Sequence, residues 1–144
     1  MAVWEPLEGL SKKGFEVSFV EPDEYGRVNV DAIRRVLKPS TLLVSPMHVN
    51  NETGVIQPIS EVASVLKDSQ IFLHVDAAQG FGKELEPLRN PRIDLISVSG
   101  RKLYAPKGIG ALIARRRGFE RSPLVPLIFG SGQERGLRGG TLWQ

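Results

Sequence analysis

Residues 71–79 read Ile-Phe-Leu-His-Val-Asp-Ala-Ala-Gln, a short apolar run that ends in a carboxylate and, three residues later, an amide. An apolar run of this length is typical of a strand covered on both faces of a sheet. Residues 41–45 and 93–98 have the same character, residues 109–114 predict a further strand, and the alternating residues 15–20 predict a half-buried one. Since strands covered on both faces occur mainly in parallel sheets, these runs predict a parallel sheet.

Helical patterns alternate with these strands. Apolar residues recur at helical spacing over residues 3–10, 33–37 and 58–67, and Asp31 can cap the second of these helices. The alternation predicts an α/β fold, a mainly parallel sheet flanked by helices, whose ligand lies at the carboxyl ends of the strands.

The composition excludes several classes of protein. The chain has 144 residues, of which 41% are hydrophobic, and we expect residues 1–144 to form a single unit with one core. Its longest apolar runs are too short to cross a bilayer, and the first residues lack the pattern of a secretory signal, so no membrane partner is expected. With no cysteine there is no disulfide framework, and the cytoplasm is the expected compartment.

The charge balance is mildly basic. The formal net charge is +3, and Arg115, Arg116 and Arg117 form the most basic stretch. No aromatic residues interleave with these arginines and no nucleic-acid-reading motif occurs, so we interpret the triplet as a solvated strand end and expect no nucleic acid partner.

Two polar side chains follow the strand expected at residues 71–75. Asp76 ends the strand and Gln79 falls in the next turn, so both can face one pocket at the edge of the sheet. A buried aspartate there can hold a pyridinium nitrogen protonated, because the carboxylate and the cation stabilise each other's charged forms. Capping of a helix is an equally common role for such an aspartate, and spacing alone leaves both open.

A lysine follows the next buried strand. Lys102 is preceded by Ser99 and Gly100, a hydroxyl and an unencumbered backbone that suit a phosphate, and by Arg101, whose charge can bind one. A lysine on a structured turn, together with a strand-end carboxylate, is the minimum set for holding pyridoxal phosphate as a Schiff base. From position alone, a surface lysine is the alternative.

The loop at residues 48–54 and the glycine-rich end of the chain supply further candidates. One amide of Asn50 and Asn51 can meet a cofactor phenolate while the other bonds to backbone, although paired asparagines are also common turn formers. His48 and His74 lack the acidic companions of a metal site, and His74 is expected to be a core histidine with satisfied hydrogen bonds. Residues 130–144 are interpreted as a binding loop.

Four segments together resemble the cysteine desulfurase family of fold-type I pyridoxal phosphate enzymes, of which selenocysteine lyases are close relatives. They are HVNNETG (48–54), HVDAAQ (74–79), SGRKLYAPKGIGAL (99–112) and GSGQERGLRGGT (130–141). They stand in the family's order and span nearly the whole chain. The resemblance implies part of the large domain of such an enzyme, with pyridoxal 5'-phosphate as cofactor.

The resemblance also implies a role for each matching residue around the cofactor ring. Lys102 corresponds to the catalytic Schiff-base lysine, Asp76 to the partner of the pyridine nitrogen and Gln79 to the donor to the phenolic oxygen. Asn51 corresponds to the asparagine near that oxygen and the substrate carboxylate.

The phosphate contacts implied by the resemblance are Ser99, Arg101 and Thr141. Thr141 matches a threonine that reaches the phosphate bound by the other subunit of the family's homodimer. Arg101 stands where family members usually have histidine, and arginine can still bind a phosphate.

The activity implied by the resemblance is the removal of sulfur from L-cysteine to give L-alanine and a persulfide, which serves sulfur transfer and iron–sulfur cluster assembly. The family's ring-stacking histidine, mobile-loop cysteine and C-terminal small domain find no match here. We therefore expect a truncated chain that covers the central part of the large domain and does not complete the cycle alone.

Two alternatives remain open. A selenocysteine lyase would differ in substrate preference. A non-catalytic fragment derived from a desulfurase would act as an interaction or dimerisation module, pairing with a longer relative. A sulfur-acceptor protein is a further partner that the resemblance implies.

Overall fold

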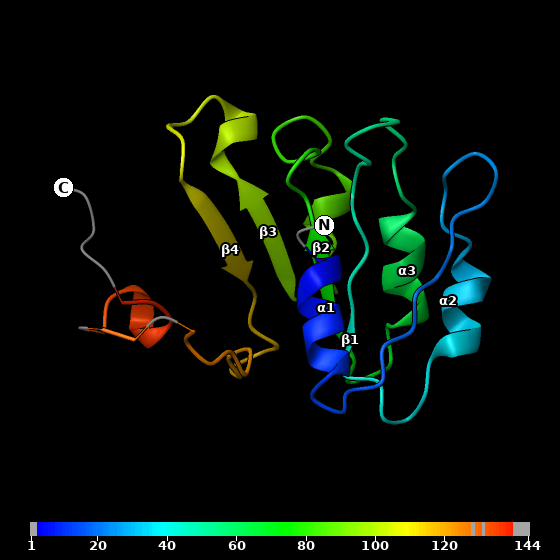
Figure 1. Ribbon diagram of the computed structural model, residues 1–144, viewed down its shortest axis with the longest axis horizontal. Helices are drawn as coiled ribbons and strands as arrows, with labels where there is room; N and C mark the ends of the chain where they lie inside the picture. Colours follow the sequence, from blue (N-terminus) through cyan, green and yellow to red (C-terminus); the bar gives the residue numbers. More distant parts are fainter. Residues whose placement is uncertain (1–2, 128, 131, 140–144) are drawn as a thin grey trace. The chain divides into compact units, whose positions relative to one another are not determined.

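The structure is a computed structural model that describes residues 3–127, 129–130 and 132–139 (Figure 1). The chain divides into two compact units, Met1–Ile113 and Ala114–Gln144, and each is described by itself. Six of the seven candidate site residues fall in the first unit. The seventh, Thr141, lies outside the described residues.

The first unit alternates helices and strands along the chain. Its α-helices are α1 (Trp4–Ser11), α2 (Val30–Val36) and α3 (Ile59–Val65). Its strands are β1 (Leu43–Val44), β2 (Phe72–Asp76), β3 (Leu95–Ser99) and β4 (Gly110–Ala114), the last of which ends on the first residue of the second unit. Two short 3-10 turns lie between these strands: η1 (Pro87–Arg89) before β3 and η2 (Gly100–Leu103) between β3 and β4.

The four strands form one sheet in the order β1-β2-β3-β4. β1 and β2 are parallel, with Leu43 opposite Phe72, and β2 and β3 are parallel, with Asp76 opposite Ser97. β4 runs against β3 (Figure 1). The predicted α/β fold with a mainly parallel sheet is thus confirmed, and the carboxyl ends of β1, β2 and β3 meet at one edge.

The two faces of the sheet differ. On one face, Leu73 and Val75 of β2 and Ile96 of β3 are buried in a core that also contains Val62 of α3 and Leu66 directly after it. The other face of β2 carries Phe72, His74 and Asp76, which are half-buried. Because side chains alternate along a strand, the apolar set fixes the register and leaves the polar set on the face that ends in Asp76.

Residues 15–20 correct one prediction, because they do not form a strand. Their alternation is that of a half-buried strand, but no ladder joins them to another described residue, and Phe15 and Phe19 are 50% and 43% exposed. Phe19 instead stacks on Trp4 of α1, with ring centroids 4.0 Å apart. Alternation of apolar and polar residues therefore does not by itself predict a strand. Strand pairing also depends on partner residues that are distant in sequence.

The structure also corrects the prediction that Asp31 caps α2. Asn29 is the N-cap residue, and its side chain accepts a hydrogen bond from the Asp31 amide at 2.8 Å. Asp31 lies inside the first turn, where its carboxylate pairs with Arg34. Asn caps as well as Asp does, so the position of the first turn decides which residue takes the role.

Strand and helix bounds are otherwise near those predicted. The strand at residues 41–45 shortens to Leu43–Val44, and the helix at residues 58–67 to Ile59–Val65. Among the described residues, no helix has the length and apolar character to cross a bilayer.

In the second unit, Arg115, Arg116 and Arg117 follow directly on β4, as expected of a strand end, and Arg116 is exposed. Arg117 and Glu120 close a tight turn with reciprocal backbone bonds of 3.1 Å. A 3-10 turn, η3 (Glu134–Gly136), follows. The described part of this unit buries little apolar surface, since Phe119 and Leu127 are 99% and 95% exposed.

Candidate functional site

Asp76 is fixed at the carboxyl end of β2 by its backbone. Its amide donates to the Pro46 carbonyl at 3.0 Å, and its carbonyl accepts from the His48 amide at 2.8 Å. The following amide, of Ala77, donates to the Ser97 carbonyl on β3 at 3.0 Å. Neighbouring segments on both sides therefore hold the base of the half-buried carboxylate in place.

The Asp76 carboxylate does not cap a helix, because residues 78–83 form turns. Its Oδ1 accepts from the Ala78 amide at 3.1 Å, which orients the group by a local turn. Its other oxygen makes no hydrogen bond within the described part of the chain, so it can accept one from a ligand.

Gln79 is carried by the turn after β2. The turn is closed by bonds from the Phe81 amide to the Ala77 carbonyl at 2.9 Å and from the Glu84 amide to the Gly80 carbonyl at 2.8 Å. This backbone places the half-buried Gln79 beyond the same strand end as Asp76.

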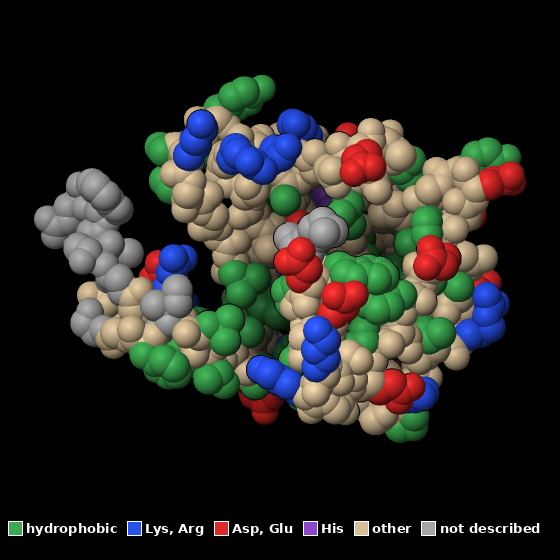
Figure 2. Space-filling model, in the orientation of Figure 1, with side chains coloured by type: hydrophobic (Ala, Val, Ile, Leu, Met, Phe, Trp, Pro, Cys, Tyr) green, Lys and Arg blue, Asp and Glu red, His purple; other side chains and the backbone are tan. Residues whose placement is uncertain are grey.

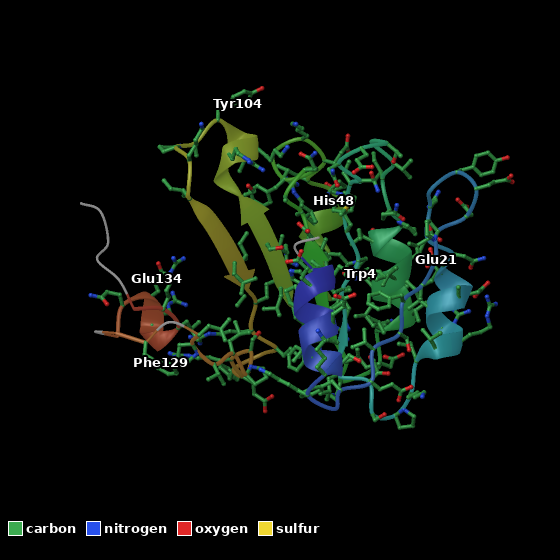
Figure 3. All side chains as sticks on the ribbon, viewed as in Figure 1. Trp4, Glu21, His48, Tyr104, Phe129 and Glu134 are labelled. Carbon is green, nitrogen blue, oxygen red and sulfur yellow. The ribbon has the colours of Figure 1, made fainter. Side chains whose placement is uncertain are left out.

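Lys102 lies on η2, which directly follows β3. The Gly100 amide donates to the Ile109 carbonyl at 2.9 Å, and the Ala105 amide donates to the Gly100 carbonyl at 3.1 Å. A Cβ at Gly100 would lie 2.8 Å from the Ile109 carbonyl oxygen, so the turn can close this tightly only on a glycine. Tyr104 ends the turn in a left-handed conformation, with φ of 61°, and projects outward (Figure 3).

The Lys102 side chain is half-buried, and its amine makes no hydrogen bond or ion pair with the residues that the structure describes. Ser99 is also half-buried, whereas Arg101 is exposed. Lys and Arg side chains gather over this part of the sheet edge (Figure 2). This edge of the sheet therefore combines the unpartnered amine of Lys102 with a positively charged surface that suits a phosphate.

The structure separates the two asparagines of the loop after β1. The Asn50 side chain accepts from the Glu52 and Thr53 amides at 2.8 and 3.0 Å, so it shapes the turn. Asn51 is exposed at the tip, and its amide makes no hydrogen bond to any described residue. Asn50 is thus the asparagine that bonds to backbone, and the contact of Asn51 with a cofactor stays a prediction.

The fold thus brings six candidates to one sheet edge, from the loop or turn that follows each of three parallel strands. They are Asn51 after β1, Asp76 and Gln79 after β2, and Ser99, Arg101 and Lys102 at or after β3. A surface depression of about 570 Å³ lies elsewhere, between α3 on one side and residues 23–29 with α2 on the other, and none of the six lines it.

His74 has a role that its place in an apolar run concealed. Its ring bonds on both sides, Nδ1 to the Ser45 hydroxyl at 2.7 Å and Nε2 to the Ser97 hydroxyl at 3.0 Å. The prediction of satisfied hydrogen bonds is confirmed, but the ring lies on the face opposite the apolar core. The signal in the sequence was a hydroxyl in each of the neighbouring apolar runs.

His48 is fully buried (Figure 3), and neither ring nitrogen has a hydrogen-bond partner among the residues that the structure describes. A Cβ at Gly80 would lie 2.7 Å from its Cε1 atom and 2.8 Å from Val49 Cγ2, so the turn after β2 can pack on the ring only through a glycine. The sequence argued against His48 as a metal ligand and gave no sign of this packing.

Burial lowers the pKa of both histidines. For His48 the nearby charge of Glu84 opposes the effect of burial, and for His74 that of Asp76 does. Both imidazoles are therefore neutral near pH 7. No group of three or more potential metal ligands occurs among the described His, Cys, Asp and Glu residues.

Comparisons with known proteins identify the family of the chain. The family model for class-V aminotransferases matches residues 1–138. The mitochondrial cysteine desulfurase of Saccharomyces cerevisiae is 47% identical over 97% of the chain, and the cysteine desulfurase IscS of Anaeromyxobacter dehalogenans 43% over 98%. The chain spans 28% and 34% of the lengths of these two relatives.

Solved structures show the same fold. DndA from Streptomyces lividans superposes with a TM-score of 0.93 at 58% identity, and SspA in complex with cysteine with 0.87 at 41%. The matches cover 98% and 97% of this chain and 40% of each of those chains. The chain belongs to the class-V aminotransferase family, and the relatives named above that carry an activity in their names are cysteine desulfurases.

Proposed function

We propose that this chain is the cofactor-anchoring part of a pyridoxal phosphate-dependent cysteine desulfurase. The observation that carries the proposal is Lys102, a half-buried residue whose amine has no partner among the described residues and which follows β3 at the same sheet edge as Asp76. The desulfurase relatives and their extent of identity support it.

The donor set fits pyridoxal phosphate. The Lys102 amine would bond the carbonyl carbon of the cofactor, Asp76 would face the ring nitrogen, and Gln79 and Asn51 the phenolic oxygen. Ser99 and Arg101 would bind the phosphate, with Thr141 reaching it from a second subunit. The unused oxygen of Asp76 and the free amide of Asn51 are the groups that such a ligand would engage.

When bound, the cofactor supplies an electron sink for the substrate's reacting carbon. Asp76 would hold a proton on the ring nitrogen by its negative charge. The Lys102 amine would take a proton from the substrate and return it. These two residues thus provide the charge stabilisation and the proton transfer.

The overall reaction converts L-cysteine and a thiol into L-alanine and a persulfide. The carbon–sulfur bond of the substrate breaks, and a sulfur–sulfur bond forms with the attacking thiolate. The 144 residues contain no cysteine, so that thiolate belongs to another polypeptide segment.

Substrate and partners belong to the same proposal. The structure of SspA in complex with cysteine supports cysteine as the substrate. A homodimer, a sulfur-acceptor protein and a role of residues 1–144 as a partial large domain follow from the resemblance. A cytoplasmic location rests on the lack of cysteine, whereas some relatives are named as mitochondrial.

A second candidate function is an interaction module. It is favoured by the apolar side chains that the second unit leaves exposed, among them Phe119, Val125 and Leu127 at 99%, 77% and 95%. Large apolar side chains that gather on a surface mark sites that bind another protein. Self-association that is independent of pyridoxal phosphate, measured by analytical ultracentrifugation, would favour this function.

The cofactor titration that tests the main proposal compares four proteins. Wild type is expected to bind pyridoxal phosphate with a saturable change in its visible absorbance, and Lys102→Ala to lose that change. Asp76→Asn should bind about tenfold more weakly, because it loses the charge that faces the ring nitrogen. Lys107→Ala, which removes an exposed lysine of the same loop, is the matched control and should behave as wild type. Equal absorbance changes in all four proteins would contradict the proposal.

A further inference from the structure

The polar face of the sheet carries a row of three hydrogen-bonded side chains that the proposed chemistry does not use. Ser45, His74 and Ser97 come from three adjacent segments, β2 and β3 among them, and the His74 ring joins the two hydroxyls at 2.7 and 3.0 Å. Hydroxyls and an imidazole in otherwise apolar runs are costly to bury unless they are bonded. The two serine hydroxyls together satisfy the hydrogen-bonding capacity of both ring nitrogens.

This row lies directly beneath the candidate site. His74 and Asp76 are two residues apart on β2 and therefore share one face of the strand. Ser97 is the register partner of Asp76, so the hydroxyl that bonds His74 Nε2 stands beside the strand end that carries the carboxylate. The ring thus ties the last residues of β2 to both neighbours at the point where the candidate site begins.

A neutral imidazole suits this place. It has one donor and one acceptor nitrogen, so one serine accepts from the ring while the other donates to it. The hydrogen bonds from one serine through the ring to the other then run in one direction, and the neutral ring adds no positive charge next to Asp76.

We propose that His74 is a positioning residue for Asp76: held between Ser45 and Ser97, its ring fixes the polar face of β2 and with it the rotamer in which the carboxylate meets its ligand. The inference rests on the proposed function, since the ligand in question is the ring nitrogen of pyridoxal phosphate. His74 itself does not touch that ligand.

The first arm of the test needs no cofactor. The Ala78 amide donates to Asp76 Oδ1, so its hydrogen exchange reports the orientation of the carboxylate. His74→Leu is expected to speed Ala78 exchange about tenfold, roughly the effect of one lost hydrogen bond. Phe72→Leu, a substitution on the same face of β2 farther from Asp76, should leave the Ala78 rate unchanged, and Asp76→Ala sets the rate for complete loss.

Conservative variants separate positioning from mere stability. Glutamine can place an amide near the position of Nε2 and asparagine near that of Nδ1, so His74→Gln can retain the Ser97 bond and His74→Asn the Ser45 bond. Because Ser97 is the partner of Asp76, we expect His74→Gln to restore slow Ala78 exchange and His74→Asn not to. Ser97→Ala should reproduce the fast exchange, and it remains informative if His74→Leu does not fold.

The second arm uses the chain loaded with pyridoxal phosphate. His74→Leu should reduce the circular dichroism of the cofactor band and weaken cofactor binding about tenfold, and His74→Gln should restore both. Unchanged Ala78 exchange in His74→Leu and Ser97→Ala would overturn the inference while leaving the proposed function intact. Failure of wild type to bind the cofactor would instead overturn the proposed function, and the exchange rates would still decide whether His74 positions Asp76.

Discussion

At the scale of single residues, His48 and Gly80 show how closely the site depends on packing beneath it. The buried ring of His48 supports the turn that carries Gln79, and the contact exists because Gly80 has no side chain. Neither residue belongs to the candidate site, yet both fix the backbone that presents it.

Gly80→Ala is therefore expected to lower the free energy of unfolding by about 1–3 kcal/mol, the usual range for an overpacked site. The new methyl group would press on His48 and Val49. Urea denaturation followed by circular dichroism measures the change. Gly9→Ala is the matched control, since Gly9 lies inside α1 with open space around it, and alanine there should be neutral or stabilising. Similar losses in both variants would show that the contact with His48 is unimportant.

The two neutral histidines predict a dependence of stability on pH. Since burial lowers the pKa of His48 and His74 below the ordinary value of 6.5, the unfolded chain binds more protons than the folded chain below that pH. Their contribution is fully retained above pH 6.5 and is lost as the pH falls from 6.5 toward the lowered pKa values. The free energy of unfolding, measured between pH 7.5 and 5.5, should therefore decrease, and less steeply in His74→Gln. A flat profile in wild type would refute the burial of neutral rings.

The sequence resolved some residue roles and left others open. It identified Asn50 and Asn51 as a pair but could not divide their roles, because the division depends on which amide faces the backbone of the turn. It could not connect His74 with Ser45 and Ser97, because those contacts cross strands whose register is set by the core.

At the scale of elements, α2 tests the corrected cap. Asn29→Ala should lower the free energy of unfolding by about 1 kcal/mol, because it removes the acceptor for the Asp31 amide. Asp31→Ala removes only an exposed ion pair and should cost less than half as much. Thermal denaturation of both variants measures the difference, and a larger loss for Asp31→Ala would reinstate Asp31 as the cap.

Arg92 joins three elements. Its guanidinium donates to the carbonyls of Leu66 after α3 and Ile71 before β2, and it pairs at 2.9 Å with Asp94, whose Oδ2 also accepts from the Leu73 amide. Both side chains are largely buried, at 15% and 5% exposure. The residue therefore fixes the entry of β2 and β3 into the sheet.

Arg92→Met should consequently cost about 3–5 kcal/mol, because it leaves the Asp94 carboxylate buried without its cation. Arg89→Met is the matched control, since its pair with Glu86 is long, at 3.8 Å, and exposed, and its loss should cost less than about 0.5 kcal/mol. Denaturant midpoints compare the two, and equal midpoints would show that Arg92 does not join the elements.

The strands expected at residues 71–75, 93–98 and 109–114 were predictable because a mostly apolar run can be recognised in the sequence without knowing its partner strand. The conformation of residues 15–20 was not predictable, because an alternating segment forms a strand only where the tertiary fold supplies a partner strand. The same limit shortened the strand at residues 41–45 to Leu43–Val44.

At the scale of the whole molecule, the sheet edge is the feature that links fold to function. Because β1, β2 and β3 are parallel, the loops that follow them lie at one edge of the sheet. Burial of the apolar face of β2 leaves Asp76 on the opposite face of that strand. The sequence predicted this edge from strand order and strand ends. It could not supply the place of Thr141, which lies outside the described residues.

The most direct test of the central claim is to locate the covalent attachment of pyridoxal phosphate. The chain is incubated with the cofactor, reduced with borohydride and digested, and the modified peptide is identified by mass spectrometry. We expect one modified residue, Lys102, near full occupancy, and no modification at the exposed Lys107 of the same loop. Absence of an adduct, or labelling spread evenly over the lysines of the chain, would contradict the claim that this sheet edge anchors the cofactor.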